Sequence, residues 1–481
     1  MILSQTAQSN RPSRFAVLNG KNMNHRKVYF WSITVALGGF LFGLDTAVIS
    51  GCERTIQKLW GLTDAMTGQM VAMALYGTIA GAIFGGIPAE RIGRRNTLFW
   101  IAIIYLVSAV GCALSPDVYT LMFFRFLGGL SVGASSVVAP MYITEISPKE
   151  KRGQLTALFQ FNIVFGILIA YLSNWLIGIA NEDAWRWMLG VVAFPSLLFV
   201  VLIPLVPESP RWLIVKKGKV EEARRTLEIV NSATVKESLA EIQASQHNTT
   251  SSSGNLKEFL SGRYRLPIIL AFLFAFFNQV SGINAVIYYA PRIFEDAGMA
   301  TSSALLSSVG IGVVNLVFTM LGLALIDRMG RRFLMYVGSI GYIISLSLVA
   351  WAFYSGAAKG GMMVPGLLFA FIAAHAIGQG AVIWVFISEI FPNQIRSWGN
   401  SLGSSTHWVF AALIAGNFPW FAGKFGQATS FAIFAFMMLF QLLFVWKMMP
   451  ETKGVSLEDL EKQMVKEDVP NTPSAATVKS V

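Results

Sequence analysis

Long apolar stretches separated by short polar connections run through most of this chain. A membrane-spanning helix needs roughly 20 mainly apolar residues, and the pattern predicts twelve such segments in two groups of six. The segments are 28–50, 67–89, 97–114, 118–141, 155–179 and 185–206, then 266–291, 303–326, 334–354, 363–390, 399–421 and 428–449. The expected fold is an all-α integral membrane protein with twelve transmembrane helices in two pseudo-symmetric six-helix bundles.

Polar stretches divide the chain into five predicted regions. We expect an N-terminal tail at 1–27, a six-helix bundle at 28–206, a linker at 207–262, a second bundle at 263–449 and a C-terminal tail at 450–481. The linker contains EEARRTLEIV, whose apolar spacing is typical of a short amphipathic helix. The first tail lacks the apolar core of a cleaved signal peptide, and Met23 offers an alternative start.

The two halves of the chain carry the same short signatures in the same order. GGIPAERIGRR recurs as GLALIDRMGRR, EISPKEKRG as EIFPNQIRSWG, and PESPRW as PETKG, at 85–95 and 322–332, 145–153 and 389–399, and 207–212 and 450–454. Three unrelated signatures with a similar separation indicate a duplicated bundle. Membrane proteins with such internal repeats include transporters that rock around a central site between the halves.

Composition and charge support the membrane class. The chain is 54% hydrophobic and 13% charged, whereas soluble proteins have about 25% charged residues. The net charge of +11 does not indicate nucleic-acid binding, because Lys and Arg gather in alternate connections. This distribution follows the positive-inside rule and predicts that both termini and the linker lie in the cytoplasm.

The chain shows no signature of an enzyme or a metal protein. It contains no H-E-x-x-H, P-loop or G-x-S-x-G motif, and we expect no catalytic residue, metal or cofactor. Cys52 and Cys112 form no disulfide framework, although a single bridge between them stays open. The spacing of Gly77, Gly81 and Gly85 indicates close helix packing and not a phosphate site.

Several motifs together resemble the sugar porter family of the major facilitator superfamily. They are ERIGRR, DRMGRR, RFLGGLSVG, PMYITEISPKEKRG, PESPRWL, NQVSGINAVIYY and PETKG. The resemblance covers about residue 30 to residue 457. It implies transport of a monosaccharide (a hexose, pentose or polyol) by alternating access.

Asp45 in FLFGLDTAVISG carries the sharpest functional prediction. A carboxylate at bilayer depth is costly unless it is paired or protonated, and Arg125 in LMFFRFLGG is the obvious partner. Proton-coupled sugar porters that resemble this chain have an aspartate here, so the resemblance implies that this pair carries the proton. The alternative is a static buried ion pair.

Amides and indoles at bilayer depth are the expected sugar contacts. Amide groups both donate and accept hydrogen bonds, as sugar hydroxyls require, and aromatic rings pack on the C–H face of the sugar. The matching positions are Gln160, Asn278, Gln279, Asn284, Asn315, Trp384, His407 and Trp408. Ser281-Gly282 should interrupt the seventh helix close to this site.

Three departures from the family pattern put the identity of the sugar in doubt. Many relatives have two glutamines where this chain has Asn278-Gln279, and many have an amide where it has His407. Ala376 stands where some relatives are acidic. His407 could bind sugar or titrate, but we favour a neutral replacement for the amide.

Two gates are implied by the resemblance. Tyr288 and Tyr289 would close the outer gate over bound sugar. A charged set on the cytoplasmic side would latch the outward-open state, with simple positive-inside signalling as the alternative. Its members are Glu90, Arg94, Arg95, Glu145, Arg152, Glu208, Arg211, Asp327, Arg331, Arg332, Glu389 and Arg396.

Taken together, the sequence predicts a proton-coupled monosaccharide importer rather than an enzyme. The alternatives are an uncoupled facilitator and a non-transporting sugar sensor, and such sensors usually carry a long tail. The expected partners are the sugar, the proton and the bilayer, with no nucleic acid and with a functional monomer. The expected location is a cell membrane crossed many times, with the bacterial inner membrane favoured by the brief outer loop and short tails.

Overall fold

The computed structural model describes residues 25–148, 151–179, 183–249, 256–260, 262–359, 361–392, 394–455, 459, 460 and 464. The described part is helical throughout, without strands. Most of the predicted N-terminal tail and most of the C-terminal tail lie outside the described residues. Eleven helices are long and apolar enough to span a membrane. The last of them, α20 (Arg396–Lys447), is broken at Gly426, whose φ is 83°, so it supplies two spans and the predicted twelve are confirmed.

Six spans form the first group, here called the N-half. They are α1 (His25–Val48), α3 (Asp64–Phe84), α5 (Arg94–Leu114), α6 (Val118–Ile146), α7 (Arg152–Gly178), and the pair α8 (Ala184–Gly190) and α9 (Ala193–Leu202). Side-chain caps fix several starts. Thr63 accepts a hydrogen bond from the Met66 N–H, and Asp117 accepts from the N–H groups of Tyr119 and Thr120, which satisfies backbone donors that a helix start leaves unpaired.

The second group, here called the C-half, has more interruptions. It comprises α14 (Arg265–Val280) with α15 (Ile283–Asp296), α16 (Thr301–Met329), α17 (Arg331–Ser355), α18 (Met363–His375) with α19 (Ala381–Glu389), and α20. The predicted break at Ser281-Gly282 is confirmed, because Gly282 takes φ 82°, which few other residues adopt. Between α18 and α19 lies a π-helical turn, η6 (Ala376–Gly380).

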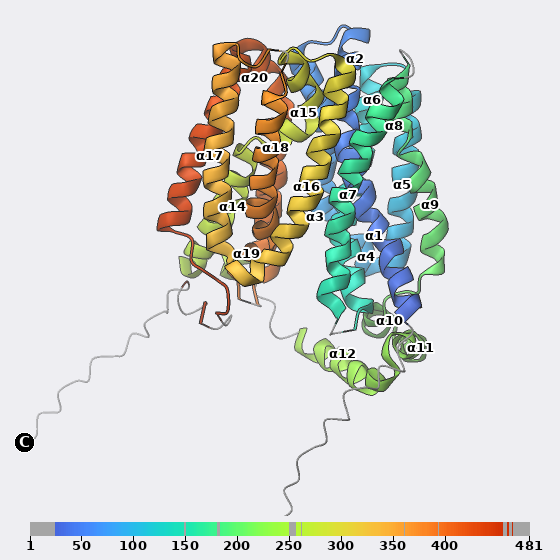
Figure 1. Cartoon of the computed structure of the whole chain (residues 1–481). Helices are drawn as coiled ribbons and strands as arrows, with labels where there is room; N and C mark the ends of the chain where they lie inside the picture. Colours follow the sequence, from blue (N-terminus) through green and yellow to red (C-terminus); the bar gives the residue numbers. More distant parts are fainter. Residues whose placement is uncertain are drawn as a thin grey trace, which may run out of the picture.

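Short helices of the linker lie at one end of the molecule, below α1 and α7 in Figure 1. They are α10 (Pro210–Lys217), α11 (Val220–Asn231) and α12 (Val235–Thr249), whereas α13 (Leu256–Phe259) packs against the C-half through Phe259 and Phe391. The predicted amphipathic helix is α11, which buries Ala223, Leu227 and Val230. We call this end of the molecule the linker end and the opposite end, near α2 (Glu53–Leu59), the far end.

Small residues allow close packing inside the N-half. A Cβ atom added to Gly77 or Gly81 would collide with backbone oxygens of α6, at Phe126 and Leu130 respectively. The helices α3 and α6 therefore approach backbone to backbone, as the glycine spacing predicted. The two cysteines, Cys52 and Cys112, are buried free thiols, so the bridge that the sequence left open is not formed here.

Candidate functional site

A buried ion pair lies inside the N-half, toward the far end, three residues before the end of α1 and seven residues after the start of α6. Nη1 of Arg125 on α6 lies 3.1 Å from Oδ1 of Asp45 on α1 and also donates to the Asp45 carbonyl at 3.3 Å. The two residues are 1% and 8% exposed. Nε and Nη2 of Arg125 have no hydrogen-bond acceptor among the described residues. The guanidinium thus has only part of its hydrogen bonds, and Asp45 is the carboxylate that compensates its charge.

The two elements of the pair have neighbours that connect them to the other half. Tyr288, on α15 of the C-half, lies within electrostatic range of both Asp45 and Arg125. Tyr171 of α7, in the N-half, donates a 2.7 Å hydrogen bond to the carbonyl of Ile287, the residue before Tyr288 on α15. The ion pair therefore sits where a movement of α15 would change its surroundings.

Amide side chains of the C-half meet at the break between α14 and α15. Gln279 donates to Oδ1 of Asn278 at 2.8 Å, and its own Oε1 accepts from Asn284 at 2.7 Å. The Gln279 nitrogen also lies 3.1 and 3.2 Å from the two ring nitrogens of His407. Since an amide NH₂ group only donates, at least one ring nitrogen of His407 must accept, and the imidazole is therefore neutral.

Aromatic rings surround this amide group. The rings of Trp384 and His407 are 5.1 Å apart, and those of His407 and Trp408 are 4.8 Å apart. Trp408 also contacts Phe42 of the N-half at 5.6 Å. Trp384 is 40% exposed, so its face remains available. This arrangement offers polar groups beside flat apolar surfaces, which is the combination that sugar binding requires.

Two predicted sugar contacts lie apart from this group. Gln160 on α7 is half-buried, with no hydrogen bond recorded to the residues that the structure describes. Asn315 on α16 is buried and accepts from the hydroxyl of Thr319 at 3.3 Å. The structure thus joins Asn278, Gln279, Asn284, Trp384, His407 and Trp408 through contacts and leaves these two separate.

The predicted outer-gate tyrosines are both buried. Tyr289 is 0% exposed and donates to the Ala415 carbonyl at 2.8 Å, and Tyr288 is 2% exposed. The backbone at Tyr289 is non-helical (φ −128°, ψ 19°), two residues before Pro291 inside α15. Because proline removes a backbone donor and crowds the preceding turn, this part of α15 is bent beside the predicted gate.

The charged motifs at the linker end form two matching clusters, one in each half. In the N-half, Arg94 binds Glu145 at 3.1 Å and Glu90 at 2.9 Å, and Glu208 accepts from the backbone N–H groups of Arg94 and Arg95. In the C-half, Arg331 binds Glu389 at 2.8 Å and Asp327 at 3.2 Å.

A second carboxylate completes the C-half cluster. Glu451 accepts from the N–H groups of Arg331 and Arg332, both at 3.0 Å. Glu208 accepts from the corresponding N–H groups of Arg94 and Arg95 in the N-half. Among the described residues, every ion pair of these clusters joins groups of one half or of that half and the linker. No such pair joins the two halves at the linker end within the described ranges.

Glu90 shows the effect of its cluster on a carboxyl group. Burial raises its pKa, but the positive charges of Arg94 and Lys216 outweigh burial and hold the pKa below its usual range. Three other predicted gate residues form none of these ion pairs. Arg396 donates to the Phe391 carbonyl at 3.2 Å, and Arg152 and Arg211 are exposed at the edge of a pocket.

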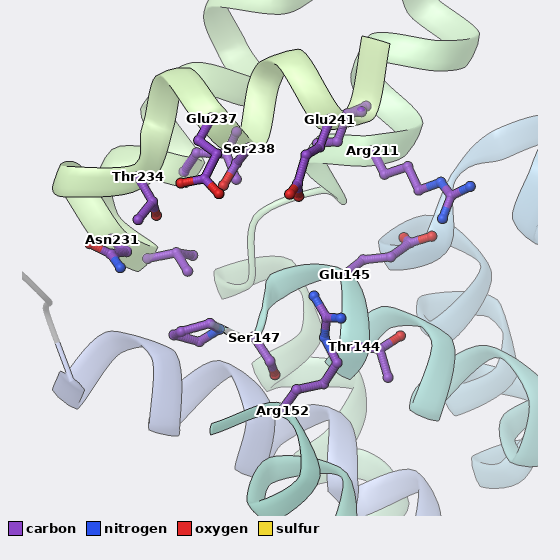
Figure 2. Close-up of a pocket in the computed structure, with 14 residues that line it drawn as sticks. Thr144, Glu145, Ser147, Arg152, Arg211, Asn231, Thr234, Glu237, Ser238 and Glu241 are labelled. Atoms are coloured by element: carbon purple, nitrogen blue, oxygen red, sulfur yellow. The ribbon is translucent and has the colours of Figure 1, made fainter. Parts of the chain in front are cut away.

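That pocket has a volume of about 400 Å³ and lies between the N-half and the linker helices. Figure 2 shows Glu145 and Arg152 on one side of it, Glu237 and Glu241 projecting from α12 on the other, and Arg211 of α10 at its edge. Its charges are mixed in sign, and it lies at the linker end rather than beside the amides. It brings three of the predicted gate residues together with the linker.

A charged cluster that the sequence reasoning missed joins the two halves at the far end. Arg54 on α2 binds Glu295 at 2.7 Å and Asp296 at 2.9 Å on α15. Arg292 of α15 lies 3.1 Å from Glu53 and 3.6 Å from Asp64. The acidic residues of these connections were visible in the sequence, but only as a contrast to the basic connections.

Glu53 has an unusual environment within this far-end cluster. It is 0% exposed, and neither carboxylate oxygen forms a hydrogen bond with the described residues, despite the short distance to Arg292. Burial raises its pKa to about 7, although Arg292 and Arg54 act in the opposite direction. In this arrangement the protonated form of Glu53 is therefore favoured over its ordinary balance in water.

Comparisons with known proteins agree with this geometry. The chain matches the family model described as sugar (and other) transporter over residues 31–464. It is 37% identical over 436 residues to a D-xylose transporter of Levilactobacillus brevis, covering 90% of this chain and 94% of that protein. It is 35% identical to the D-xylose-proton symporter of Escherichia coli (strain K12), covering 92% and 96%.

Solved structures give the same result. The inward open conformation of the xylose transporter XylE from E. coli superposes with a TM-score of 0.80 and 32% identity, covering 91% of this chain and all of that one. The match to the family model extends over both halves and the linker. The chain therefore belongs to the family of sugar (and other) transporters, and its twelve-helix fold is that of the major facilitator superfamily.

Proposed function

We propose that this protein imports a monosaccharide together with a proton by alternating access. The observation that carries the proposal is the buried Asp45–Arg125 pair in the N-half together with a neutral amide and aromatic site in the C-half. Relatives at 35–37% identity over nearly their whole length are named as a xylose transporter and a xylose-proton symporter. A pentose is accordingly the first sugar to test.

Asp45 is the proposed proton carrier. A carboxylate beside Arg125 favours the charged form, whereas burial without that partner favours the protonated form. A conformational change that separates the two groups therefore drives protonation, and one that reunites them drives release. Arg125 supports this role because two of its nitrogens lack acceptors among the described residues, which leaves the pair as its principal bond.

Asn278, Gln279, Asn284, Trp384, His407 and Trp408 are the proposed sugar contacts, with Gln160 and Asn315 joining from α7 and α16. The hydroxyls of a monosaccharide need partners that both donate and accept, and amide groups provide both. The indole of Trp384, exposed beside His407, would pack on the apolar face of the ring. A site of this kind binds a neutral ligand without moving charge.

The gates follow from where the halves are joined. Tyr288, Tyr289 and the far-end ion pairs would keep the outer side closed in this conformation, which resembles the inward open state of XylE. The linker-end clusters would hold each half rigid and, in the outward-open state, would approach one another across the gate. Both sets of charges would therefore act in one transport cycle, each closing the gate at its own end.

The orientation rests on charge. Basic side chains dominate the linker end (Arg91, Arg94, Arg95, Lys151, Arg152, Lys216, Lys217, Arg328, Arg331 and Arg332), whereas Glu53, Asp64, Asp117, Glu295 and Asp296 lie at or beside the far end. By the positive-inside rule the linker and both termini are cytoplasmic. The proposed location is a cell membrane, of a bacterium by similarity to the relatives, with the monomer as the transporting unit and the five predicted regions as its parts.

Uptake into proteoliposomes tests this function. D-xylose, L-arabinose, D-glucose and myo-inositol, each labelled, would be offered with an inward proton gradient, without a gradient, and with an uncoupler. We expect at least one sugar to accumulate above its external concentration only with the gradient. Equilibration that is insensitive to the gradient for every transported sugar would instead show an uncoupled facilitator.

A further inference from the structure

A continuous chain of buried hydrogen bonds extends from the proposed sugar site into the core of the C-half. Asn278 donates to Oε1 of Gln379 at 3.2 Å, Gln379 donates to Oε1 of Gln441 at 3.1 Å, and Gln441 donates to the hydroxyl of Ser339 at 2.9 Å. Ser339 donates to the Met335 carbonyl at 2.7 Å. The chain crosses from α14 through the π-helical turn η6 to α20 and ends on α17.

Burial isolates this series of hydrogen bonds from solvent. Gln279, Gln379, Gln441 and Ser339 are each 0% exposed, and Asn278 is 2% exposed. A buried polar group without a partner is costly, so each amide must keep both its donor and its acceptor paired. One amide group cannot rotate by about 180° alone, because two donors or two acceptors would then lie opposite each other.

The end of the chain determines its direction. A backbone carbonyl can only accept, so the Ser339 hydroxyl must donate to Met335 and must accept from Gln441. The Gln441 oxygen then accepts from Gln379, and the Gln379 oxygen accepts from Asn278. The same sense continues beyond Asn278, because its oxygen accepts from Gln279, whose oxygen accepts from Asn284.

This fixed direction decides what the site presents to a ligand. The Gln279 nitrogen is occupied by Asn278 and the His407 ring, and its oxygen by Asn284. The Asn284 oxygen then remains as an acceptor, and the second hydrogens of the Asn278 and Asn284 amides remain as donors. A sugar hydroxyl near each position is recognised by whether it must donate or accept.

We propose that Gln379, Gln441 and Ser339 are positioning residues that set the amide orientations of Asn278, Gln279 and Asn284 and thereby determine hydroxyl selectivity. This inference rests on the proposed sugar transport. None of the three residues need touch the sugar, since they act through the chain of bonds. The π-helical turn is part of the device, because Gln379 lies within it and connects α14 with α20.

The test removes the end of the chain while leaving the sugar contacts unchanged. Ser339→Ala deletes the hydroxyl that sets the direction, and Ser339→Thr restores it. Ser345→Ala is the matched control, because Ser345 is also buried on α17 and donates to a backbone carbonyl four residues earlier, outside the chain. Gln441→Met is a second break that keeps the side-chain length.

The measurement is equilibrium binding of D-xylose, L-arabinose and D-glucose, and of the monodeoxy and deoxyfluoro analogues of each, to the purified full-length protein in nanodiscs. Loss of a correctly oriented partner for a hydroxyl changes discrimination by about tenfold or more. We expect Ser339→Ala and Gln441→Met to reduce discrimination against at least one analogue by about that factor. Ser339→Thr and Ser345→Ala should keep the wild-type profile.

A purely structural role gives a different result. It would lower thermal stability and the affinity for all analogues together while the ratios among them stayed constant, and this outcome, or an unchanged profile, would overturn the inference. A wild-type protein that binds none of the sugars would overturn the proposed function itself. Selective wild-type binding with unaltered ratios in both variants would overturn only the orientation proposal.

Discussion

The two halves are nearly identical at the linker end and different in their buried interiors. Arg94 with Glu145 and Glu208 is reproduced by Arg331 with Glu389 and Glu451, down to an arginine that also donates to a backbone carbonyl five residues earlier. In its interior the N-half holds a charged pair, whereas the C-half holds an uncharged series of hydrogen-bonded amides. The repeat has kept the charged clusters of the linker end, while the proposed proton and sugar groups differ between the halves.

This division has a physical reason. A proton carrier needs a group whose charge changes, and a charge in the membrane interior needs a partner. A sugar site needs hydrogen-bond groups of fixed orientation, and a nearby titrating group would change them during the cycle. The proposed placement of the two functions on separate bundles allows one to change charge while the other keeps its geometry.

The largest expected effect concerns the charged pair of the N-half. Asp45→Asn removes the titrating carboxyl but keeps an oxygen that can accept from Arg125. We expect the accumulation ratio of sugar in proteoliposomes to fall to equilibrium, while sugar-for-sugar exchange continues. Glu221→Gln, a change on the exposed face of α11, should leave accumulation intact. Uphill accumulation by Asp45→Asn would contradict the division between halves.

The equivalence of the linker-end clusters gives the second prediction. Arg94→Ala and Arg331→Ala each remove a buried guanidinium from a part-buried carboxylate, Glu145 or Glu389, and loss of hydrogen bonds to a charged group costs about 2 kcal/mol. We expect both variants to lower the free energy of unfolding by similar amounts, measured by chemical denaturation in detergent. A loss confined to one of them would show that the two clusters are not mechanically equivalent.

The amide site gives the third prediction. Gln279→Leu removes the bonds to Asn278, Asn284 and His407 at once. We expect sugar affinity to fall about 30-fold, or about 2 kcal/mol, from unpaired buried groups. Proton coupling of the residual transport should persist, and Gln154→Leu at the exposed start of α7 serves as the control. A loss of coupling without loss of affinity would reverse the assigned roles.

The smallest expected effect lies at the far end, where the halves meet. Burial raises the pKa of Glu53 to about 7 in this closed arrangement, against an ordinary value of about 4.3 in water. Below the lower value both arrangements are protonated and pH has no influence. As pH rises from there to about 7, the open arrangement releases its proton first. Closure is therefore progressively disfavoured in that range and constant above it.

Distances between spin labels measure this equilibrium. Labels at Leu114 and Tyr354, exposed at the far-end termini of α5 and α17, report separation of the two halves. We expect the separated population to increase up to about tenfold between pH 5 and pH 8, which is less than the full linkage of the pKa shift. Glu53→Gln should remain closed at both values, and an equal pH response in that variant would exclude Glu53.

Sequence patterns were sufficient for the fold because each span is determined locally by its own apolar length. They also identified the Asp45–Arg125 pair and the break at Gly282, since a charge at bilayer depth and a Ser-Gly pair in an apolar segment are local anomalies. They did not identify Gln379 and Gln441. Both are polar residues within spans, but their importance depends on which helices pack together. The packing of helices cannot be predicted from the residues of one segment alone.

The far-end cluster was missed for a related reason. Glu53, Arg54, Arg292 and Glu295 lie in two connections far apart in the sequence, and only the closed arrangement of the halves brings them together. The linker-end clusters show the converse. Their residues were identified from the repeat, but the structure pairs them within each half, because the halves in this conformation are joined at the far end.

The central claim is that proton movement and sugar movement are one event, carried by Asp45. It is tested most directly by adding sugar to proteoliposomes that contain a pH-sensitive dye, with no gradient imposed. The account predicts that sugar entry acidifies the lumen with the wild-type protein. It predicts no acidification with Asp45→Asn, even though that variant still exchanges sugar. Sugar entry without proton movement in the wild type, or equal acidification by the variant, would contradict it.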